Sequence, residues 1–384
     1  MRFEAFFLRD WQRASAWQIL LRPMSLLYMV MTAIRSALYR TKFLHKHRAR
    51  VPVVVVGNIT VGGTGKTTVV LAIAQRLLEA KQSPGIVTRG YAPVRNQAKF
   101  PQVIHVLPQA NKTFSSSETA FGLSDEAQLL ALRSGVPVYT GVKRALAVET
   151  LLSKHVDVNL VISDDGLQHY ALDRDIEIAV VDGVRGFGNG FMLPAGPLRE
   201  PSSRLQAVDC IVLNNTNIDD SFQEKMPEKT CQVAALRKSL ETADRPVFVM
   251  TYGNEIFVPL QSDHIAGHNA PQGETTKVFV EKFCDKRIAA MAGIGHPERF
   301  FSHLERLGII LASRHAFPDH YAFARADVTG IDADVIVMTE KDAVKCFAYG
   351  DERMWAMRID ALLPDAFYKF MLKKIDDVTR PKVA

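Results

Sequence analysis

The sequence of 384 residues predicts an α/β protein, with a doubly wound, mostly parallel sheet followed by a second, smaller α/β domain. Two observations lead to this prediction. A β-branched run at residues 51–56 precedes a glycine-rich turn and a helical pattern, the opening unit of a doubly wound sheet. A second strand–turn–helix pattern begins near residue 287. The first 50 residues differ from both parts, because they are rich in basic and aromatic side chains.

Charge is distributed unevenly along the chain. The 47 basic and 41 acidic residues give a net charge of +6 in an otherwise ordinary globular composition, which excludes a disordered or collagen-like chain. Ten basic residues within 1–50 stand against only Glu4 and Asp10, so that segment carries +8 and residues 51–384 carry −2. Because the basic excess belongs to one terminal segment, we expect no nucleic-acid partner, although binding by residues 1–50 is a possible alternative.

The N-terminal segment predicts a membrane-associated helix. Its apolar run, Pro23 to Ile34, is 12 residues long and is bounded by Arg22 and Arg35. A spanning helix needs about 20 apolar residues, so a simple span is not expected. Aromatic residues interleaved with arginines instead favour a helix lying on an anionic membrane surface. The alternative is a helix that packs on the domain behind it.

The four cysteines, Cys210, Cys231, Cys284 and Cys346, form no Cys-x-x-Cys pair, and no pair of histidines is spaced to complete a zinc site. Their wide spacing predicts reduced thiols.

Alternation of apolar runs and helical patterns predicts the elements of the first domain. Strands are expected at 51–56, 85–88, 136–139, 158–163, 176–182 and 210–213. Helices are expected at 66–80, 126–133 and 144–152. The segment 187–201 is rich in Gly and Pro and predicts a long functional loop.

The pattern restarts at about residue 246. Two short strands, 247–250 and 256–258, are expected around Gly253-Asn254, followed by a polar surface loop at 261–277. A strand–turn–helix unit at 287–297 and a buried strand at 335–338 complete the pattern. The predicted domains are therefore an N-terminal segment at 1–50, a nucleotide-binding domain at 51–245 and a smaller domain at 246–384.

A phosphate-binding loop follows the first strand. The sequence Gly62-Gly63-Thr64-Gly65-Lys66-Thr67 opens the first helix, where backbone amides can bind phosphate and Lys66 can contact the β- and γ-phosphates. Thr67 is placed to ligate Mg²⁺. Thr60 replaces the first glycine of the usual pattern. The predicted ATP-binding residues are Thr60, Val61, Gly62, Gly63, Thr64, Gly65, Lys66, Thr67 and Thr68.

An acidic pair follows another buried strand. Asp164 and Asp165 come directly after the apolar residues 158–163, at the edge where open α/β sheets bind ligands. One of them is expected to hold Mg²⁺, and the alternative is an ordinary turn.

Several motifs together resemble the tetraacyldisaccharide 4′-kinase family of lipid A biosynthesis. The resemblance covers nearly the whole chain. Its motifs are VVVVGNITVGGTGKTTVV at 53–70, TRGY at 88–91, SDE at 124–126, DDGLQH at 164–169, RDIE at 174–177, LPAGPLREP at 193–201, AGIGHPERF at 292–300, FPDHY at 317–321 and TEKDA at 339–343.

The resemblance implies a kinase of the phosphate-loop NTPase type. It implies transfer of the γ-phosphate of ATP, with Mg²⁺, to the 4′-hydroxyl of a tetraacylated glucosamine disaccharide 1-phosphate, which gives lipid IVA. It also implies two α/β domains with ATP in the cleft between them, and an N-terminal helix on the cytoplasmic face of the bacterial inner membrane. No obligate protein partner is expected.

The resemblance also implies roles for individual residues. Asp125 is the general base, and His320 from the second domain is its partner, so that the pair is assembled from both domains. The alternative for Asp125 is a helix N-cap. For His320 it is a loop histidine with a structural hydrogen bond.

Five further residues are candidates for ligand contacts. Arg199 is expected to meet phosphate and Glu200 to meet Mg²⁺, unless the two pair with each other. Arg144 is a candidate for the 1-phosphate or ATP, with a solvated helix face as the alternative. Arg89 and Gln168 are candidate substrate contacts. The motif at 339–342 is interpreted as structural or hinge-related.

Departures from the family pattern are small. Thr68 replaces the usual proline of the phosphate loop, and Ser124 and Ala127 flank the acidic pair where the family has Gly and Pro. The leading rival function is a membrane-associated switch ATPase of the partitioning type, which shares the glycine-rich loop. Such proteins typically carry a lysine where this chain has Val61, and they lack a second α/β domain of this size.

Overall fold

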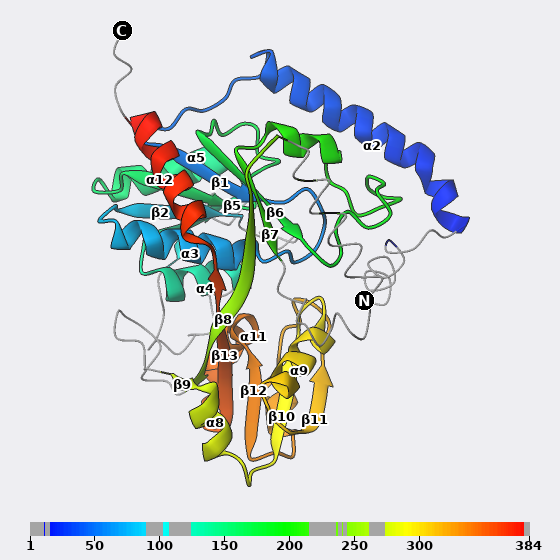
Figure 1. The fold of residues 1–384 in the computed structure, drawn as a ribbon, viewed down its shortest axis with the longest axis vertical. Coiled ribbons are helices and arrows are strands. Elements are labelled where there is room, and N and C mark those ends of the chain that lie inside the picture. The colour runs from blue at the N-terminus through cyan, green and yellow to red at the C-terminus, as the bar shows by residue number, and fades with distance from the viewer. Residues whose placement is uncertain are drawn as a thin grey trace. The chain divides into compact units, whose positions relative to one another are not determined.

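The computed structural model describes residues 11, 16–89, 103–106, 124–214, 236, 240, 244–260 and 273–379. The chain divides into two compact units (Figure 1). Unit 1 comprises residues 1–89, 143–252 and 361–384, and unit 2 comprises residues 90–142 and 253–360. This division differs from the predicted one. The described residues 103–106 and 124–142 belong with the second unit, and residues 361–379 belong with the first.

Unit 1 contains a parallel sheet with β1 at its centre. Its strands, in spatial order, are β7 (Cys210–Asn214), β6 (Ile176–Asp182), β1 (Val53–Gly57), β5 (Leu160–Asp164) and β2 (Pro84–Thr88). The first residues of β8 (Val247–Pro259) pair with β7 in parallel. All residues of β1 and β6 are buried, as expected of strands covered on both faces.

The first strand–turn–helix unit forms as predicted. Strand β1 leads through residues 58–65 into α3 (Lys66–Glu79), whose buried positions recur at helical spacing. Because β1 and β5 are parallel neighbours, with Val56 aligned to Asp164, the residues following both strands emerge at the same edge of the sheet. Helix α5 (Arg144–Lys154) precedes β5, and the short helix η2 (Ser202–Ala207) precedes β7.

Two terminal helices complete unit 1. Helix α12 (Asp365–Thr379) packs through Phe367 and Phe370 on Phe248 of β8, and Lys374 Nζ lies 2.9 Å from Asp209 Oδ1. Helix α2 (Ala16–Arg40) is 25 residues long and is the long blue helix on the outside of this unit in Figure 1. Helix α2 is longer than the 12-residue apolar run, Pro23 to Ile34, from which a membrane-associated helix was predicted.

In unit 2, four strands pair in parallel in the order β11 (Leu311–Ala316), β10 (Ile288–Ala292), β12 (Val335–Thr339) and β13 (Met354–Leu362). Strand β8 is the next neighbour of β13 in the sheet. The helices of unit 2 are α4 (Asp125–Ser134), α8 (Thr276–Lys282), α9 (Pro297–Arg306), α10 (Arg325–Thr329), α11 (Glu340–Cys346) and the one-turn η3 (Phe347–Tyr349). An antiparallel pair, β3 (Val103–Val106) with β4 (Val138–Gly141), also belongs to unit 2.

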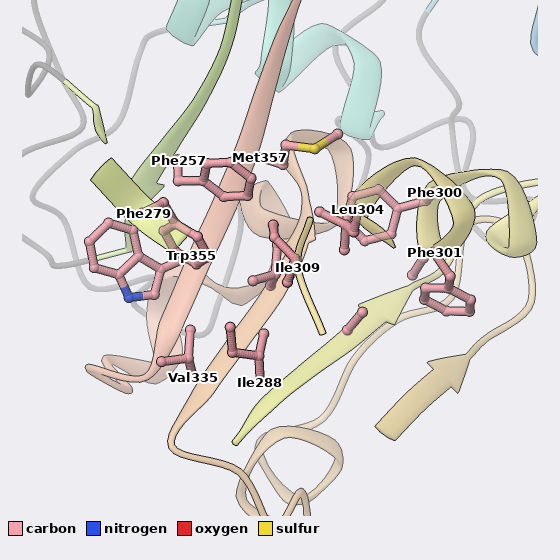
Figure 2. Close-up of a cluster of buried hydrophobic side chains, with 13 residues drawn as sticks. Phe257, Phe279, Ile288, Phe300, Phe301, Leu304, Ile309, Val335, Trp355 and Met357 are labelled. Atoms are coloured by element: carbon pink, nitrogen blue, oxygen red, sulfur yellow. The ribbon is translucent and has the colours of Figure 1, made fainter. Parts of the chain in front are cut away.

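Both faces of strand β10 in unit 2 are buried. Along β10, Ile288, Ala290 and Ala292 belong to one hydrophobic cluster, whereas Ala289 and Met291 belong to another. Aromatic rings dominate the first cluster (Figure 2), where Phe257 stacks on Phe279 with ring centroids 4.1 Å apart. Alternate side chains of one strand therefore serve two cores, as in a sheet with helices on both faces.

Two predictions of local structure were wrong. The two short strands around Gly253-Asn254 are one strand, β8, because Asn254 adopts a left-handed conformation (φ 56°) within it rather than forming a turn. Asparagine tolerates this conformation better than most residues. The predicted loop at 261–277 is wrong at its C-terminal end, because β9 (Glu274–Thr275) pairs with β8 and α8 begins at Thr276. Residues 261–272 lie outside the described residues.

Candidate functional site

The phosphate-binding loop lies at the start of α3. Gly65 caps the helix with φ 87° and, as a glycine, offers no side-chain cap to the first amides. A Cβ atom at Gly65 would lie 2.7 Å from Asn214 Nδ2, so the close packing here also requires glycine. Unpaired amides at a helix N-terminus favour an anion, so the loop fits the phosphate groups of ATP.

The side chains of two asparagines hold the phosphate loop in place through hydrogen bonds. Asn58 Nδ2 donates to the Thr64 hydroxyl at 3.2 Å and to Gly62 O at 3.4 Å. Asn214, at the end of β7, donates to Thr64 O at 3.0 Å. Thr68 Oγ1 donates to Gly65 O at 2.8 Å, so its hydroxyl closes the first helical turn. Sequence reasoning missed both asparagines, although each is a polar residue at the carboxyl end of a buried strand.

The Gly- and Pro-rich segment runs beside the entry to this loop. Val61 N donates to Pro197 O at 2.9 Å, and Arg199 N donates to Ile59 O at 2.7 Å. A bridge also joins Thr60 to Leu198. The segment 187–201 therefore has little regular structure but a defined position, and it brings Arg199 to the phosphate loop.

Lys66, Asp165 and Arg199 form one charged cluster. Asp165 Oδ1 lies 3.5 Å from Lys66 Nζ, and Arg199 Nη1 lies 3.0 Å from both carboxylate oxygens of Asp165. Burial alone would raise the pKa of Asp165, but the charges of Lys66 and Arg199 lower it to about 2. Asp165 also adopts φ 49°, a conformation uncommon outside glycine. Asp165 thus lies in a turn and belongs to this charged cluster.

Asp164 and Arg144 lie beside that cluster in the interior. Asp164 is buried at the end of β5, and its carbonyl oxygen accepts a hydrogen bond from Arg144 Nη2 at 3.0 Å. Arg144 itself is only 1% exposed. The alternative of a solvated helix face is therefore wrong for Arg144, because its guanidinium group is turned into the unit.

Glu200 is held by neutral donors. Gln168 Nε2 donates to Glu200 Oε2 at 2.9 Å, and the Tyr170 hydroxyl donates to Oε1. Arg204 Nε lies 3.9 Å from Glu200 Oε2. The alternative in which Arg199 and Glu200 pair with each other is wrong, because Arg199 pairs with Asp165. Gln168 also donates to Asn58 O at 2.9 Å, which links Glu200 to the phosphate loop.

The candidate substrate residues share one electropositive neighbourhood. Burial and four neighbouring guanidinium groups lower the pKa of the His169 imidazole to about 4. These groups belong to Arg144, Arg35, Arg89 and Arg174. The charges of Arg89 and Arg144 thus both lower the pKa of His169, the residue next to Gln168. Gly90 and Tyr91 of the TRGY motif lie outside the described residues.

Asp125 and His320 meet within unit 2. His320 Nδ1 lies 3.2 Å from Asp125 Oδ2, and His320 adopts φ 57°. The expectation that the two residues come from different domains was wrong, because α4 belongs to unit 2. The N-cap alternative is also wrong for Asp125, since Ser124 is the N-cap and its hydroxyl accepts from Ala127 N at 3.2 Å.

The electrostatics of this pair favour an ionised carboxylate. Burial would raise the pKa of Asp125, but the hydrogen bond with His320 and the charge of Lys345 lower it below its ordinary value. The same hydrogen bond raises the pKa of His320. An ionised carboxylate next to an imidazole is able to accept a proton from a hydroxyl group.

The donor set also fits Mg²⁺ accompanying a nucleotide. Thr67 lies in the first turn of α3, and the carboxylates of Asp164, Asp165 and Glu200 belong to the same unit. Hard oxygen ligands of this kind suit Mg²⁺, which usually keeps waters and phosphate oxygens as its other ligands. Within the described part of the chain, no group of three His, Cys, Asp or Glu side chains forms a metal cluster of its own.

Comparisons with known proteins match one family over most of the chain. The family described as tetraacyldisaccharide-1-P 4′-kinase matches residues 17–376. Two curated relatives are both called tetraacyldisaccharide 4′-kinase. The protein from Methylobacillus flagellatus is 38% identical over 97% of this chain and 96% of its own length. The protein from Nitrosococcus oceani is 37% identical over 99% of this chain and 97% of its own length.

A solved structure is similar over nearly the same length. The crystal structure of LpxK from Aquifex aeolicus in complex with ATP has a TM-score of 0.70 and 26% sequence identity, and the match covers 93% of this chain and 99% of that one. The fold, the phosphate loop and the match over residues 17–376 point to one conclusion. This chain belongs to the tetraacyldisaccharide-1-P 4′-kinase family.

Proposed function

We propose that this chain transfers the γ-phosphate of ATP to the 4′-hydroxyl of tetraacyldisaccharide 1-phosphate, which gives lipid IVA in lipid A biosynthesis. The observation that carries the proposal is the cluster of Lys66, Asp165 and Arg199 beside an uncapped helix N-terminus, in a chain of this family. The rival switch ATPase is not favoured, because the family match extends through both units.

In the proposed reaction, the acceptor oxygen forms a bond to the γ-phosphorus, the bond to the β-phosphate oxygen breaks, and ADP leaves. Lys66 and the amides of the phosphate loop bind the phosphate oxygens, and Arg199 adds a second cation. Mg²⁺, when bound through Thr67 and the nearby carboxylates, neutralises charge on these oxygens. Asp125 accepts the hydroxyl proton, and His320 orients the carboxylate through Oδ2.

We further propose that Arg89, Arg144 and Gln168 bind the lipid headgroup. Their support is the electropositive neighbourhood around His169, which suits a phosphate group of the substrate. A buried arginine keeps its charge, so Arg144 provides an attraction for anions that does not change across the physiological pH range.

We also propose a location at the cytoplasmic face of the inner membrane, and helix α2 supports contact with a membrane surface, because its polarity is inverted. Polar residues face the unit, since Gln18 and Ser25 are buried. The Ser25 hydroxyl donates a hydrogen bond to Met192 O at 2.8 Å and accepts one from Ala195 N at 2.9 Å. Apolar residues face outward at helical spacing. They include Leu20, Met24, Leu27, Met31 and Ile34.

An exposed apolar stripe on a basic segment fits an anionic membrane surface. Residues 18–40 are the one described helix with the length and composition to cross a membrane, at a mean hydropathy of 1.2. The inverted polarity favours lying on the surface, since one side of the helix is bound to unit 1 through polar contacts.

A transfer assay tests the proposed function. The purified chain is incubated with γ-labelled ATP, Mg²⁺ and tetraacyldisaccharide 1-phosphate in detergent micelles. We expect label in the lipid, at the 4′ position, and none when the lipid or Mg²⁺ is omitted. Hydrolysis of ATP without any transfer to lipid would instead support the switch ATPase.

A further inference from the structure

Helix α11 lies beside α4, the helix that carries Asp125, and ion pairs join the two at both ends. Arg133 Nη1 of α4 lies 2.9 Å from Glu340 Oε2, where α11 begins. At the opposite end, Lys345 Nζ of α11 lies 3.1 Å from Asp125 Oδ2. The two helices are therefore antiparallel, and their relative position is fixed by charge at each end.

Lys345 also forms an ion pair with Asp342 on its own helix. Its ammonium group lies 3.2 Å from Oδ1 of Asp342, a carboxylate with no exposed surface. The other oxygen of Asp342 accepts from Gly293 N at 2.9 Å and from the Thr339 hydroxyl at 2.7 Å. Because Asp342 is fixed by a backbone amide and a hydroxyl, it fixes the ammonium group of Lys345, whose side chain is only 12% exposed.

Both contacts that fix the Asp125 carboxylate end on the same oxygen. Within the described residues, His320 Nδ1 and Lys345 Nζ approach Oδ2 at 3.2 and 3.1 Å. We propose that Lys345, anchored by Asp342, is a positioning residue that fixes Asp125 through Oδ2 and leaves Oδ1 for the acceptor hydroxyl. The inference rests on the proposed function, because it takes Asp125 as the base.

Charged groups face Asp125 from three segments. Helix α11 contributes Lys341, Asp342 and Lys345, helix α4 contributes Glu126, and the loop before α10 contributes Asp319 and His320. Lys341 Nζ lies 3.2 Å from Asp319 Oδ1 and 3.5 Å from His320 Nε2. Lys341 is therefore paired mainly with Asp319, whereas Lys345 contacts Asp125 directly.

This arrangement has a chemical consequence for the base. A cation in contact with a carboxylate favours its ionised form, and the net effect of burial, His320 and Lys345 is a lowered pKa of Asp125. Loss of the Lys345 charge should raise that pKa and release the carboxylate from one of its two fixed contacts. Fewer enzyme molecules would then hold an ionised, correctly oriented base at a given pH.

The test compares Lys345→Met with Lys277→Met in the full chain. Lys277→Met is a matched control, because it removes the same charge from a lysine of the same unit whose side chain is 85% exposed and whose Nζ lies 4.0 Å from Glu281 Oε1. For Lys345→Met we expect a kcat lower by roughly 10- to 100-fold, with the KM for ATP changed by less than about twofold. The acidic limb of the kcat profile should move up by about one pH unit.

Conservative and polar variants separate positioning from stability. Lys345→Arg keeps the charge and should restore part of kcat and the position of the acidic limb. Lys345→Gln serves the same purpose as the Met variant if the latter does not fold. A Lys345→Met profile that matches Lys277→Met would overturn the inference, as would a lower kcat with an unmoved acidic limb and no recovery in Lys345→Arg.

Asp125→Asn, measured in parallel, distinguishes failure of the proposed base from failure of the proposed positioning role of Lys345. If Asp125→Asn retains normal turnover, the assignment of the base fails and the positioning role fails with it. If Asp125→Asn is inactive and Lys345→Met behaves like Lys277→Met, only the positioning role is overturned.

Discussion

Lys66 Nζ and Asp165 Oδ1 lie 3.5 Å apart, although the two residues are 99 positions apart in the sequence. The contact arises because β1 and β5 are parallel neighbours, so that the segments following them reach one edge of the sheet. Lys66, the first residue of α3, thus pairs with a carboxylate that also binds Arg199.

This relationship predicts the effect of removing the Lys66 charge. In Lys66→Met, ATP affinity should fall by roughly 10- to 100-fold, since hydrogen bonds to charged groups contribute about 1.5–3 kcal/mol. Lys154→Met, an exposed lysine in the same unit, is the matched control and should bind ATP normally. Titration calorimetry measures both. Equal ATP affinity in the two variants would contradict the placement of Lys66 at the phosphates.

Replacement of Asp125 should affect chemistry rather than nucleotide binding. In Asp125→Asn, kcat should fall by roughly 100- to 10,000-fold, because an amide cannot accept the hydroxyl proton. The Kd for ATP should stay within about twofold, since the phosphate loop is unchanged. Steady-state transfer rates and ATP titrations measure the two effects. Glu281→Gln, at an exposed position of the same unit, is the control. Turnover of Asp125→Asn near that of the control would contradict the assignment of Asp125 as the base.

The outward face of α2 predicts a variant that separates membrane binding from nucleotide binding. The triple change of Leu20, Leu27 and Met31 to Gln should greatly weaken cosedimentation with vesicles of anionic lipid, because it removes apolar side chains that are more than half exposed. ATP binding should be retained. Val156→Gln, an exposed apolar residue elsewhere in unit 1, should leave both properties unchanged.

This variant is a sharper test than deletion of the N-terminal segment. The inward face of α2 contacts the loop that leads to Arg199, and Gln18 accepts from Asn189 Nδ2 at 3.1 Å. Deletion would therefore disturb the active-site loop together with the membrane contact. Normal vesicle binding by the triple variant would contradict the membrane-docking role of the exposed face.

His169 predicts a pH dependence of stability. The pKa of this imidazole is about 4 in the folded chain, below its value of about 6.5 in an unfolded chain. Between these values the unfolded chain binds more protons, so the stabilising contribution is full above pH 6.5 and is lost as the pH falls towards 4. His169→Asn should make the melting temperature less dependent on pH across this window. An unchanged dependence would show that other groups determine it.

Much of the site was predictable because its residues follow patterns that are local in sequence. The glycine-rich loop predicts a phosphate site by its position between a buried strand and a helix. Asp164 and Asp165 are candidates because they come at the end of another buried strand. The positions of Arg144 and Tyr170 were not predictable. Whether an arginine at the start of a helix turns inward depends on the neighbouring strand, not on the helix itself.

The sequence by itself determined the α/β class, the family, the central strands, the phosphate loop and the unusual character of the first 50 residues. These features depend on periodicity and on short motifs, which a chain carries whatever its tertiary contacts. Only the tertiary structure decided that α4 belongs with the second unit, that α2 turns its polar side inward, and that Lys345 meets Asp125. Each of these depends on contacts between segments distant in sequence, where packing and charge select among arrangements that the local pattern leaves open.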